Sequence, residues 1–402
     1  MSYARRSIER EIPEDRIYLF YTMFLLCLTG LLGITITGDV FNLFVFLEIS
    51  SLSSYVLISL GKDRRALTAA YRYLIMGTIG ATFYIIGVGL MYMMTGTLNM
   101  ADLSTLIPTI ADTRTIQAAM AFLTGGICLK LALFPLHLWL PNAYTYAPSV
   151  VTAFLAATAT KVALYVLMRI VFSVYGAFHI IDAIPYIQEM LIGLALIGVF
   201  VASSVAIFQN DMKRMLAFSS VAQIGYMVLG LSFASTLGLT AGIIHLFNHA
   251  LMKCALFLAM GCVFLRVGGV SLDNMKGLGK SMPWTMAAVV LGGLSLIGVP
   301  LTVGFISKWY LLLAALEEGH WVIAGLVVMG SLLAVIYVWR LVEAAYLQEA
   351  PEDAEPVKEA PLSMLLPLWV MVGASLYFGI DATNTLEIAT SAAEILLYGG
   401  AQ

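Results

Sequence analysis

Long apolar segments follow one another along this chain, and they constrain its fold more than any other feature of the sequence. A window of about 19 residues finds about eleven of them. The segments cover residues 17–36, 38–60, 68–94, 115–134, 149–176, 187–208, 214–234, 237–266, 283–313, 320–347 and 362–380. Charged residues make up only 11% of the chain, against about 25% in soluble domains. With a mean hydropathy of +0.93, the sequence predicts an all-α membrane protein with about eleven transmembrane helices.

Basic residues between these segments are divided unequally between the two sides of the predicted bundle. If residue 1 is cytoplasmic, Arg114 falls alone on the outer side. The cytoplasmic side then holds Arg5, Arg6, Arg10, Arg16, Lys62, Arg64, Arg65, Arg72, Lys213, Arg214, Arg266, Lys276, Lys280 and Lys358. Cytoplasmic loops are enriched in Lys and Arg, so the N-terminus is predicted inside and the C-terminus outside.

Composition divides the chain into five parts. Residues 1–16 are predicted to form an exposed cytoplasmic arm, because acids follow its basic residues and no signal cleavage site ends the first span. Residues 348–361 are acidic and proline-rich and are predicted to be a solvated linker before the last helix and tail at 362–402. Two transmembrane repeats are expected between these parts, at 17–176 and 187–347.

Each predicted repeat contains one apolar segment that carries a lysine and is interrupted by proline or glycine. In the first repeat Lys130 precedes Pro135. In the second, Gly298 and Pro300 precede Lys308. Interrupted, charge-bearing spans at matching places in two halves are typical of transporters built from inverted repeats. We therefore expect a broken helix in each half.

Charged side chains inside the apolar segments are the strongest functional signal. They are Glu48, Lys130, Lys161, Arg169, Lys253, Lys308 and Arg340. Each charge near the centre of a bilayer costs about 3 kcal/mol even on the lenient insertion scale. Four lysines and one glutamate would then cost roughly 15 kcal/mol together, as much as the stability of a whole domain. We expect them to face one another or a hydrated interior, while Arg169 and Arg340, near helix ends, are expected to snorkel.

Glu48 is expected to form an ion pair with a lysine from another helix, although a carboxylate near a helix end that reaches water is the simpler alternative. Lys130 and Lys161 lie in adjacent spans and suit a relay, because a desolvated lysine can release its proton. Asp39 lies at a span edge, where it is expected to be either an acid of the buried charged group or a helix cap.

His245, His249 and Lys253 are spaced four residues apart and so share one helix face over roughly 12 Å. Three titratable groups in register within a membrane favour a hydrated proton path over isolated core residues. A metal site is disfavoured, since no HExxH glutamate or cysteine partner accompanies the histidines. His137 is expected to be either a proton-uptake group or a capping residue, and His179 and His320 carry no functional signal.

Redox chemistry is not expected within this chain. Cys27, Cys128, Cys254 and Cys262 all lie in apolar segments without iron–sulfur spacing, and no cofactor motif is present. No metal, cofactor or nucleic acid is therefore expected as a ligand.

Several of these segments together are similar to one known family. The stretches DVFNLFVFLEISSLSSYVLI, LKLALFPLHLWLPNAY, QNDMKRMLAFSSVAQIGYM, HLFNHALMKCALFL and SLIGVPLTVGFISKW resemble the antiporter-like proton-translocating membrane subunits. These subunits occur in respiratory complex I, membrane-bound hydrogenases and Mrp-type sodium/proton antiporters, and the resemblance is closest to the D-type subunits of Mrp antiporters. It covers about residues 17–380.

The resemblance implies two inverted five-helix repeats, each with a broken helix, in a prokaryotic plasma membrane. By motif, Glu48 and Lys130 resemble the glutamate–lysine pair of the first half, and Lys161 the next relay. His245, His249 and Lys253 resemble the central relay, and Lys308 the terminal lysine of the second broken helix. Other membrane subunits of one complex are implied as partners, and the complex as a whole can be redox-driven. The ion moved is implied to be the proton, with sodium as an open question.

Two departures from the family pattern are visible. Family members usually have three further helices before the first span, and a separate small subunit is one expected source of them. Family members often have PDAH where this chain has Pro141-Asn142-Ala143-Tyr144, which leaves the proton-uptake route open. A stand-alone transporter of sodium or a solute is the alternative function, and transport by the purified chain alone would distinguish it.

Overall fold

The computed structural model describes residues 2–176, 186–350 and 357–399, and these residues form helices without any β-strand. Nine helices in the described residues are long and apolar enough to cross a membrane. The first half of the chain contains α1 (Ser2–Glu11), η1 (Glu14–Arg16), α2 (Ile17–Ile36), α3 (Val40–Ser59), α4 (Arg65–Thr95), α5 (Met100–Ile110), α6 (Arg114–Leu131), α7 (Trp139–Tyr146), α8 (Ser149–Met168) and the π-helix η2 (Arg169–Tyr175). The second contains α10 (Ile187–Ile207), α11 (Met212–Ser232), α12 (Thr236–Val267), α13 (Leu272–Met275), α14 (Leu278–Ser281), α15 (Pro283–Ile297), α16 (Val303–Glu317), α17 (Trp321–Tyr346), α18 (Leu362–Ile380) and α19 (Thr383–Tyr398).

Two predicted spans are not among the nine, and both are interrupted. The span predicted at 115–134 ends as α6 at Leu131, and a short helix, α7, resumes only at Trp139. The span predicted at 283–313 is divided into α15 and α16 by residues 298–302. We call residues 132–138 the first break and residues 298–302 the second break.

The two halves of the chain repeat the same order of contacts. In the first, Asp39 caps α3 and pairs with Asn99 in an isolated bridge, while in the second Asp211 caps α11 and pairs with Ser271. In each half, an arginine near the end of a later helix (α8 or α17) donates to a backbone carbonyl that precedes the aspartate-capped helix. Arg169 donates to the carbonyl of Thr37, and Arg340 to the carbonyls of Ile207 and Gln209. Both arginines are only partly buried, so these hydrogen bonds leave their predicted snorkelling a prediction.

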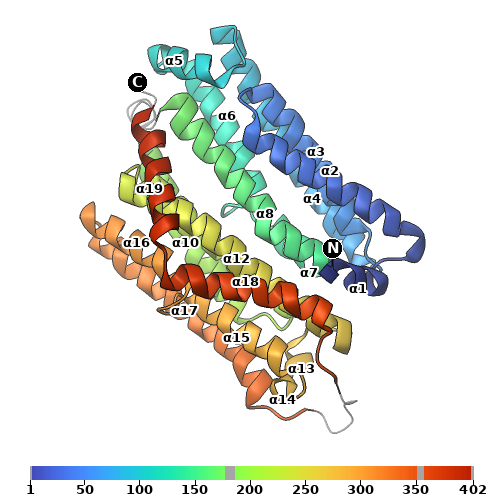
Figure 1. Cartoon of the computed structure of the whole chain (residues 1–402). Coiled ribbons are helices and arrows are strands. Elements are labelled where there is room, and N and C mark those ends of the chain that lie inside the picture. Colours follow the sequence, from blue (N-terminus) through green and yellow to red (C-terminus); the bar gives the residue numbers. More distant parts are fainter. Residues whose placement is uncertain (1, 177–185, 351–356, 400–402) are drawn as a thin grey trace.

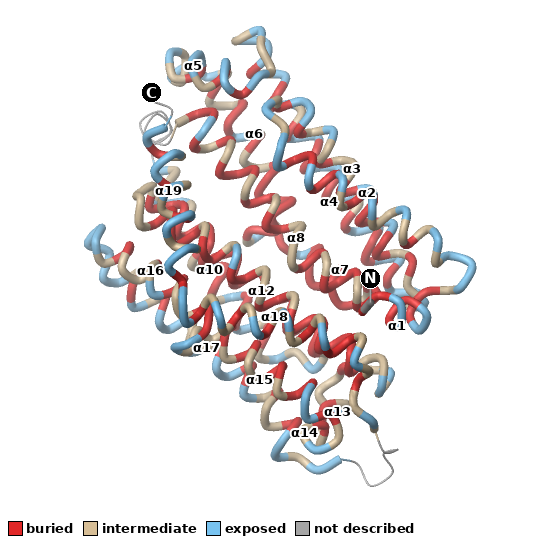
Figure 2. The backbone as a smooth tube through the Cα atoms, in the orientation of Figure 1, coloured by how far each residue is buried: buried red, intermediate tan, exposed pale blue. Residues whose placement is uncertain are grey.

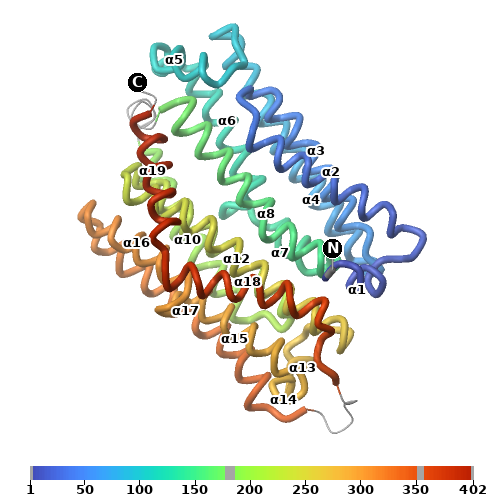
Figure 3. The backbone as a smooth tube through the Cα atoms, in the orientation of Figure 1, coloured from blue at the N-terminus to red at the C-terminus, as the bar shows by residue number. Residues whose placement is uncertain are grey.

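The halves lie side by side in Figures 1 and 3, with α2–α8 in blue to green and α10–α19 in yellow to red. Helix α8 packs against α12 where the halves meet, and α18 crosses over α12 and α15. Burial is greatest along this central region (Figure 2). Every residue of α11 except Arg214 is buried. The site described below is carried by these central helices.

The N-terminal segment is not the exposed arm that the sequence predicts. Residues 2–11 form α1, whose Tyr3, Ile8 and Glu11 are buried against α8, α12 and α18. Tyr3 donates a 2.8 Å hydrogen bond to the carbonyl of Leu258, and the Glu11 carboxylate accepts from the backbone N–H of Ser149 at 2.8 Å. Arg and Glu alternate with apolar residues at helical spacing in this segment, so one face of the helix can be buried while the other stays charged.

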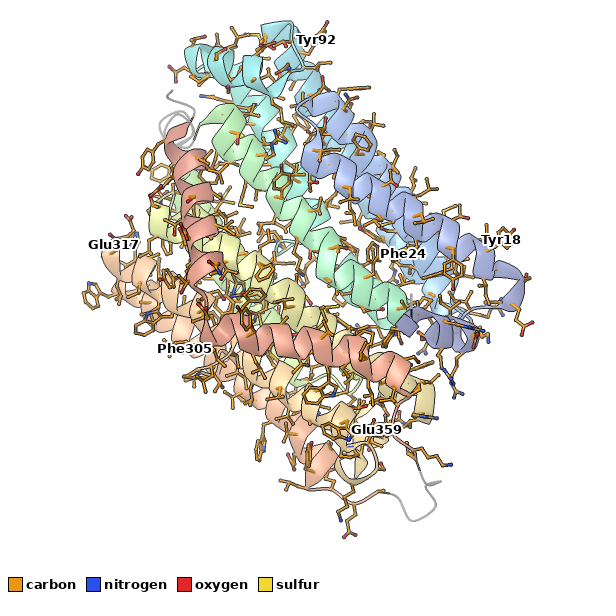
Figure 4. All side chains as sticks on the ribbon, viewed as in Figure 1. Tyr18, Phe24, Tyr92, Phe305, Glu317 and Glu359 are labelled. Atoms are coloured by element: carbon orange, nitrogen blue, oxygen red, sulfur yellow. The ribbon has the colours of Figure 1, made fainter. Side chains whose placement is uncertain are left out.

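The remaining segments differ in smaller ways. The loop predicted at 95–114 contains α5, and the tail after residue 380 contains α19. Within the acidic linker 348–361, residues 351–356 lie outside the described residues, as does His179. Exposed aromatic residues stand at opposite ends of the bundle, with Tyr18 and Tyr92 labelled in Figure 4. Such residues are typical of the two membrane–water interfaces.

Candidate functional site

Glu48 and Lys130 form the ion pair that the sequence predicts. Glu48 lies on α3 and Lys130 in the last turn of α6. The Lys130 ammonium nitrogen is 2.9 Å from Glu48 Oε1 and donates a second hydrogen bond of 2.7 Å to Ser51 Oγ. Side-chain exposure is 8% for Lys130 and 25% for Glu48, so the pair is mostly removed from the surface of the chain. Each partner offsets the cost of burying the other.

The first break places Lys130 beside an open helix end. Ala132 takes a left-handed conformation with φ of 63°, and α6 ends there, two residues after Lys130. The carbonyl of Leu129 accepts a 3.0 Å hydrogen bond from Trp139 Nε1, whose ring stacks on Tyr73 at 3.8 Å between centroids. A backbone carbonyl freed by the break is thus satisfied inside the protein, as a break at membrane depth requires.

A small cavity lies between Lys130 and α8. Its volume is about 20 Å³, enough for one water molecule, and its polar lining comes from Ser50, Ser51, Ser54 and Lys130. On α8 it is bounded by Ala159, Val162 and Ala163, which flank Lys161 in the sequence. The cavity provides polar space beside Lys130, but Lys161 does not line it.

Lys161 is buried on α8 without a carboxylate partner. Its ammonium donates to the carbonyl of Ala156 and lies 3.5 Å from Thr160 Oγ1. Only 4% of the residue is exposed. Since a lysine held by neutral oxygen atoms has no permanent counter-charge, its protonation depends on the charges around it.

His245, His249 and Lys253 lie on one buried face of α12, as predicted. His245 Nδ1 is 2.7 Å from Ser307 Oγ and its Nε2 is 3.0 Å from Gln223 Oε1. The rings of His245 and His249 are stacked with centroids 6.2 Å apart. Among the residues that the structure describes, neither ring nitrogen of His249 has a hydrogen-bond partner, although His249 is fully buried. Buried polar groups of this kind are typically satisfied by internal water.

Lys253 is fully buried at the other end of this face. Its ammonium donates to the carbonyl of Leu216 at 2.8 Å and to Ser219 Oγ at 2.5 Å, both on α11. The charge of Lys161 interacts with His249 and Lys253 across the contact between α8 and α12. The first half of the site is therefore in electrostatic contact with the second.

Lys308 lies beside the second break. It lies on α16, and its ammonium donates back across the break to the carbonyls of Leu296 and Ile297, at 3.1 and 2.9 Å. The ring of Tyr226 lies 4.9 Å away. The last carbonyls of a helix carry partial negative charge, which stabilises a cation at this position. Since Lys308 also interacts with His245, the row of groups runs from α3 to α16.

The remaining candidates have local structural roles. Asp39 caps α3 by accepting from the backbone N–H groups of Phe41 and Asn42, which confirms the capping interpretation. His137 is buried in the first break and stacks on Phe134, but it does not cap α7, so that alternative is wrong. Its Nδ1 has no partner among the described residues. His320 stacks on Phe233.

Several polar residues of the site were missed in the sequence. They are the neutral partners Ser51, Ser219, Gln223, Tyr226 and Ser307. The serine run at 50–54 and the glutamine inside an apolar segment were visible signals, because uncharged polar residues are also disfavoured in lipid. Single serines and tyrosines occur in many membrane helices, so Ser307 and Tyr226 gave no distinguishing signal.

Comparisons with known proteins agree with this arrangement. Residues 37–334 match the family described as NADH:quinone oxidoreductase/Mrp antiporter, TM. The chain is 47% identical over 381 residues to NADH-quinone oxidoreductase subunit N of Desulforudis audaxviator, covering 92% of this chain and 75% of the relative. It is 30% identical over 384 residues to the D subunit of the Na(+)/H(+) antiporter of Alkalihalophilus pseudofirmus, covering 96% of this chain and 77% of the relative.

A solved structure has the same fold. A chain of the Mrp complex from a Dietzia species superposes with a TM-score of 0.86 at 27% identity, covering 93% of this chain and 77% of that chain. The match extends over nearly all of this chain.

Proposed function

This chain belongs to the NADH:quinone oxidoreductase/Mrp antiporter transmembrane family, and on that premise we propose that it moves protons along its row of buried charges. The chain is a multi-pass, antiporter-like subunit of an Mrp-type or complex I-like membrane assembly. The proposed path runs from Glu48 and Lys130 through Lys161 to the α12 face. It ends at Lys308.

One observation carries this proposal: one buried ion pair is followed by three buried lysines that have no carboxylate partner. No carboxylate oxygen in the described residues lies within 4.0 Å of Lys161, Lys253 or Lys308. A structural role would favour paired charges, because a lone buried ammonium is costly. Groups held by neutral oxygens can instead gain and lose a proton as neighbouring charges change.

Transfer would be driven by the position of the Glu48 side chain. At 2.9 Å its charge holds a proton on Lys130, and at an effective dielectric constant of about 20 two charges about 4 Å apart interact by about 4 kcal/mol. Rotation of Glu48 away from Lys130 removes that interaction and favours transfer of the proton toward Lys161. The positive charge then acts on His249 and Lys253 in turn. Lysine suits these positions because arginine does not release its proton.

The contacts repeated in the two halves support inverted repeats at 17–176 and 187–347. Each half has an aspartate-capped helix, a long helix, a broken helix and a final helix with a terminal arginine. An odd number of crossings in each half would invert the second relative to the first. The basic residues favour a cytoplasmic N-terminus and an outside C-terminus. The partners would be other membrane subunits, among them a small subunit, and sodium would be the exchanged ion in an Mrp-type assembly.

Space in the site disfavours transport of an organic solute. The cavity beside Lys130 has a volume of about 20 Å³, which holds one water molecule. Ligand cavities for small molecules are usually about 300 Å³ or larger. The space beside Lys130 therefore suits water and protons better than a bulky substrate.

The test compares Lys130→Ala and Glu48→Ala with a partly exposed control in the intact complex reconstituted in vesicles. Both variants should lose proton translocation while co-purifying with the same subunits as the unmodified chain. Lys276→Ala, which removes a partly exposed lysine paired with Asp273 at 2.7 Å, should translocate at the normal rate. Normal rates in both site variants would falsify the proposal.

A further inference from the structure

A polar cavity of about 510 Å³ lies outside the row of buried charges, at the α1 end of the bundle. It is lined by α1, by the loop between α3 and α4, and by the ends of α7, α11 and α12. Helices α1 and α7 lie next to each other in Figure 1. Its charged lining comes from Arg10, Glu11, Lys62, Asp63 and Lys213. A cavity of this size and polarity holds a cluster of water molecules.

Lys213 is the group that links this cavity to the interior. The sequence places it in a basic loop, but only 3% of the residue is exposed. Its ammonium donates a 2.9 Å hydrogen bond to the carbonyl of Ala147, and the ring of Phe264 lies 5.8 Å away. An ammonium has three N–H groups. Two donors thus remain for water in the cavity that Lys213 lines.

The carboxylates near Lys213 are occupied by other groups. Glu11, Asp63 and Asp211 all interact with Lys213 through their charges, but none lies within 4.0 Å of its ammonium in the described residues. Glu11 accepts hydrogen bonds from Ser7 and Ser149 instead. Hydrogen bonds from Arg65 lower the pKa of Asp63 below its usual value, so this carboxylate stays ionised at neutral pH. Asp63 is thus neutralised by Arg65, and Lys213 stays without an ion pair in the described residues.

Lys213 is one helical turn from the row of buried charges. Lys253 donates to the carbonyl of Leu216, three residues after Lys213 on α11. Three residues correspond to a rise of about 4.5 Å along a helix. One turn of α11 thus separates the floor of the cavity from the acceptor of the Lys253 ammonium.

We propose that this cavity is where the chain takes up protons from the aqueous phase, and that Lys213 passes them to Lys253. The proposal rests on the proton-translocating function argued above and names its uptake route. A proton from cavity water binds neutral Lys213, and Lys213 then releases a proton toward Lys253. No covalent step is needed. Water in the cavity restores the proton on Lys213 after each transfer.

Two neighbouring residues allow the cavity to be blocked with a matched control. Lys62 and Arg64 are both exposed basic residues of the α3–α4 loop, but only Lys62 lines the cavity. Lys62→Cys and Arg64→Cys can be labelled with a bulky, membrane-impermeant maleimide in the intact complex in vesicles, with the unmodified chain treated in parallel. Labelled Lys62→Cys should translocate protons about tenfold more slowly, equivalent to about 1.4 kcal/mol in the barrier. Labelled Arg64→Cys should keep the rate of the unlabelled variant.

Lys213→Arg tests the role of Lys213. Arginine keeps the positive charge and a donor for the Ala147 carbonyl, but it does not release its proton. If Lys213 carries protons, Lys213→Arg should be about as slow as Lys213→Gln although both co-purify with the complex. A normal rate in Lys213→Arg would limit Lys213 to binding the α7 carbonyl and overturn its part in the proposal.

The outcomes separate the uptake route from the function itself. If unlabelled protein translocates protons and the label on Lys62→Cys changes nothing, uptake occurs elsewhere and the cavity proposal is overturned. If the unlabelled complex does not translocate protons at all, the function proposed for the chain fails instead.

Discussion

The two breaks interrupt a helix in the same way but treat their lysines differently. In the first, Lys130 is neutralised by Glu48, and a freed carbonyl is satisfied by Trp139. In the second, Lys308 has no carboxylate within 4.0 Å in the described part of the chain, and its ammonium itself satisfies the freed carbonyls. In the first break, one residue neutralises the lysine and another donates to the freed carbonyl. In the second break, the Lys308 side chain is both the buried charge and the donor to the freed carbonyls.

This difference assigns different properties to the two ends of the row of charges. A proton on Lys130 is held by a full negative charge that can move with the Glu48 side chain. A proton on Lys308 is held by fixed carbonyl dipoles, which are weaker and do not move. We therefore infer that the first break is the adjustable end and the second the end from which a proton is most easily released.

The largest expected effect comes from breaking the Glu48–Lys130 pair. Glu48→Gln leaves Lys130 buried without a counter-charge and should lower the free energy of unfolding by about 3 kcal/mol. Lys308→Met leaves two carbonyls without a donor but strands no charge, and should cost about 1–2 kcal/mol. Unfolding of the purified complex in mixed micelles measures both. The double variant Glu48→Gln with Lys130→Met should recover most of the loss, and equal losses in the two single variants would show that the breaks do not differ.

A smaller effect is expected from the residues that end α6 and α15. Gly298 has φ of 94°, and an added Cβ would lie 3.0 Å from Lys308 Cδ. Gly298→Ala should therefore cost about 1–2 kcal/mol. Ala132 already has φ of 63°, so Ala132→Gly should change stability by less than about 1 kcal/mol. The same unfolding measurement applies, and a neutral Gly298→Ala would contradict the assigned backbone conformation.

The smallest expected effect concerns the carbonyl donor of the first break. Trp139→Phe keeps an aromatic ring against Tyr73 but removes the hydrogen bond to Leu129, which should cost about 1 kcal/mol. Trp309→Phe, at a residue that is 47% exposed, should change stability by less than about 0.5 kcal/mol. Indistinguishable unfolding curves for the two variants would mean that the Ala132 N–H, 3.2 Å from the Leu129 carbonyl oxygen, satisfies this carbonyl by itself.

Much of the architecture follows from the sequence. The predicted apolar segments begin and end within a few residues of the helices, and the breaks lie where glycine and proline interrupt them. The Glu48–Lys130 pair was also predicted. Lys213 was misplaced because a lysine at the start of a helix looks the same whether it reaches water or is covered, and α1, α12 and the end of α7 cover it only in three dimensions.

The sequence by itself determined which ionisable groups had to be kept from lipid, because transfer into a bilayer is a property of each residue and its position in a span. It could not determine which oxygen atoms would hold them. Lys253 is bound by α11 and Lys308 by the end of α15, and Lys161 meets the α12 face only because the two halves pack together. Tertiary structure decided these partners, since hydrogen bonds and ion pairs between helices depend on distances of a few ångströms that helical periodicity does not fix.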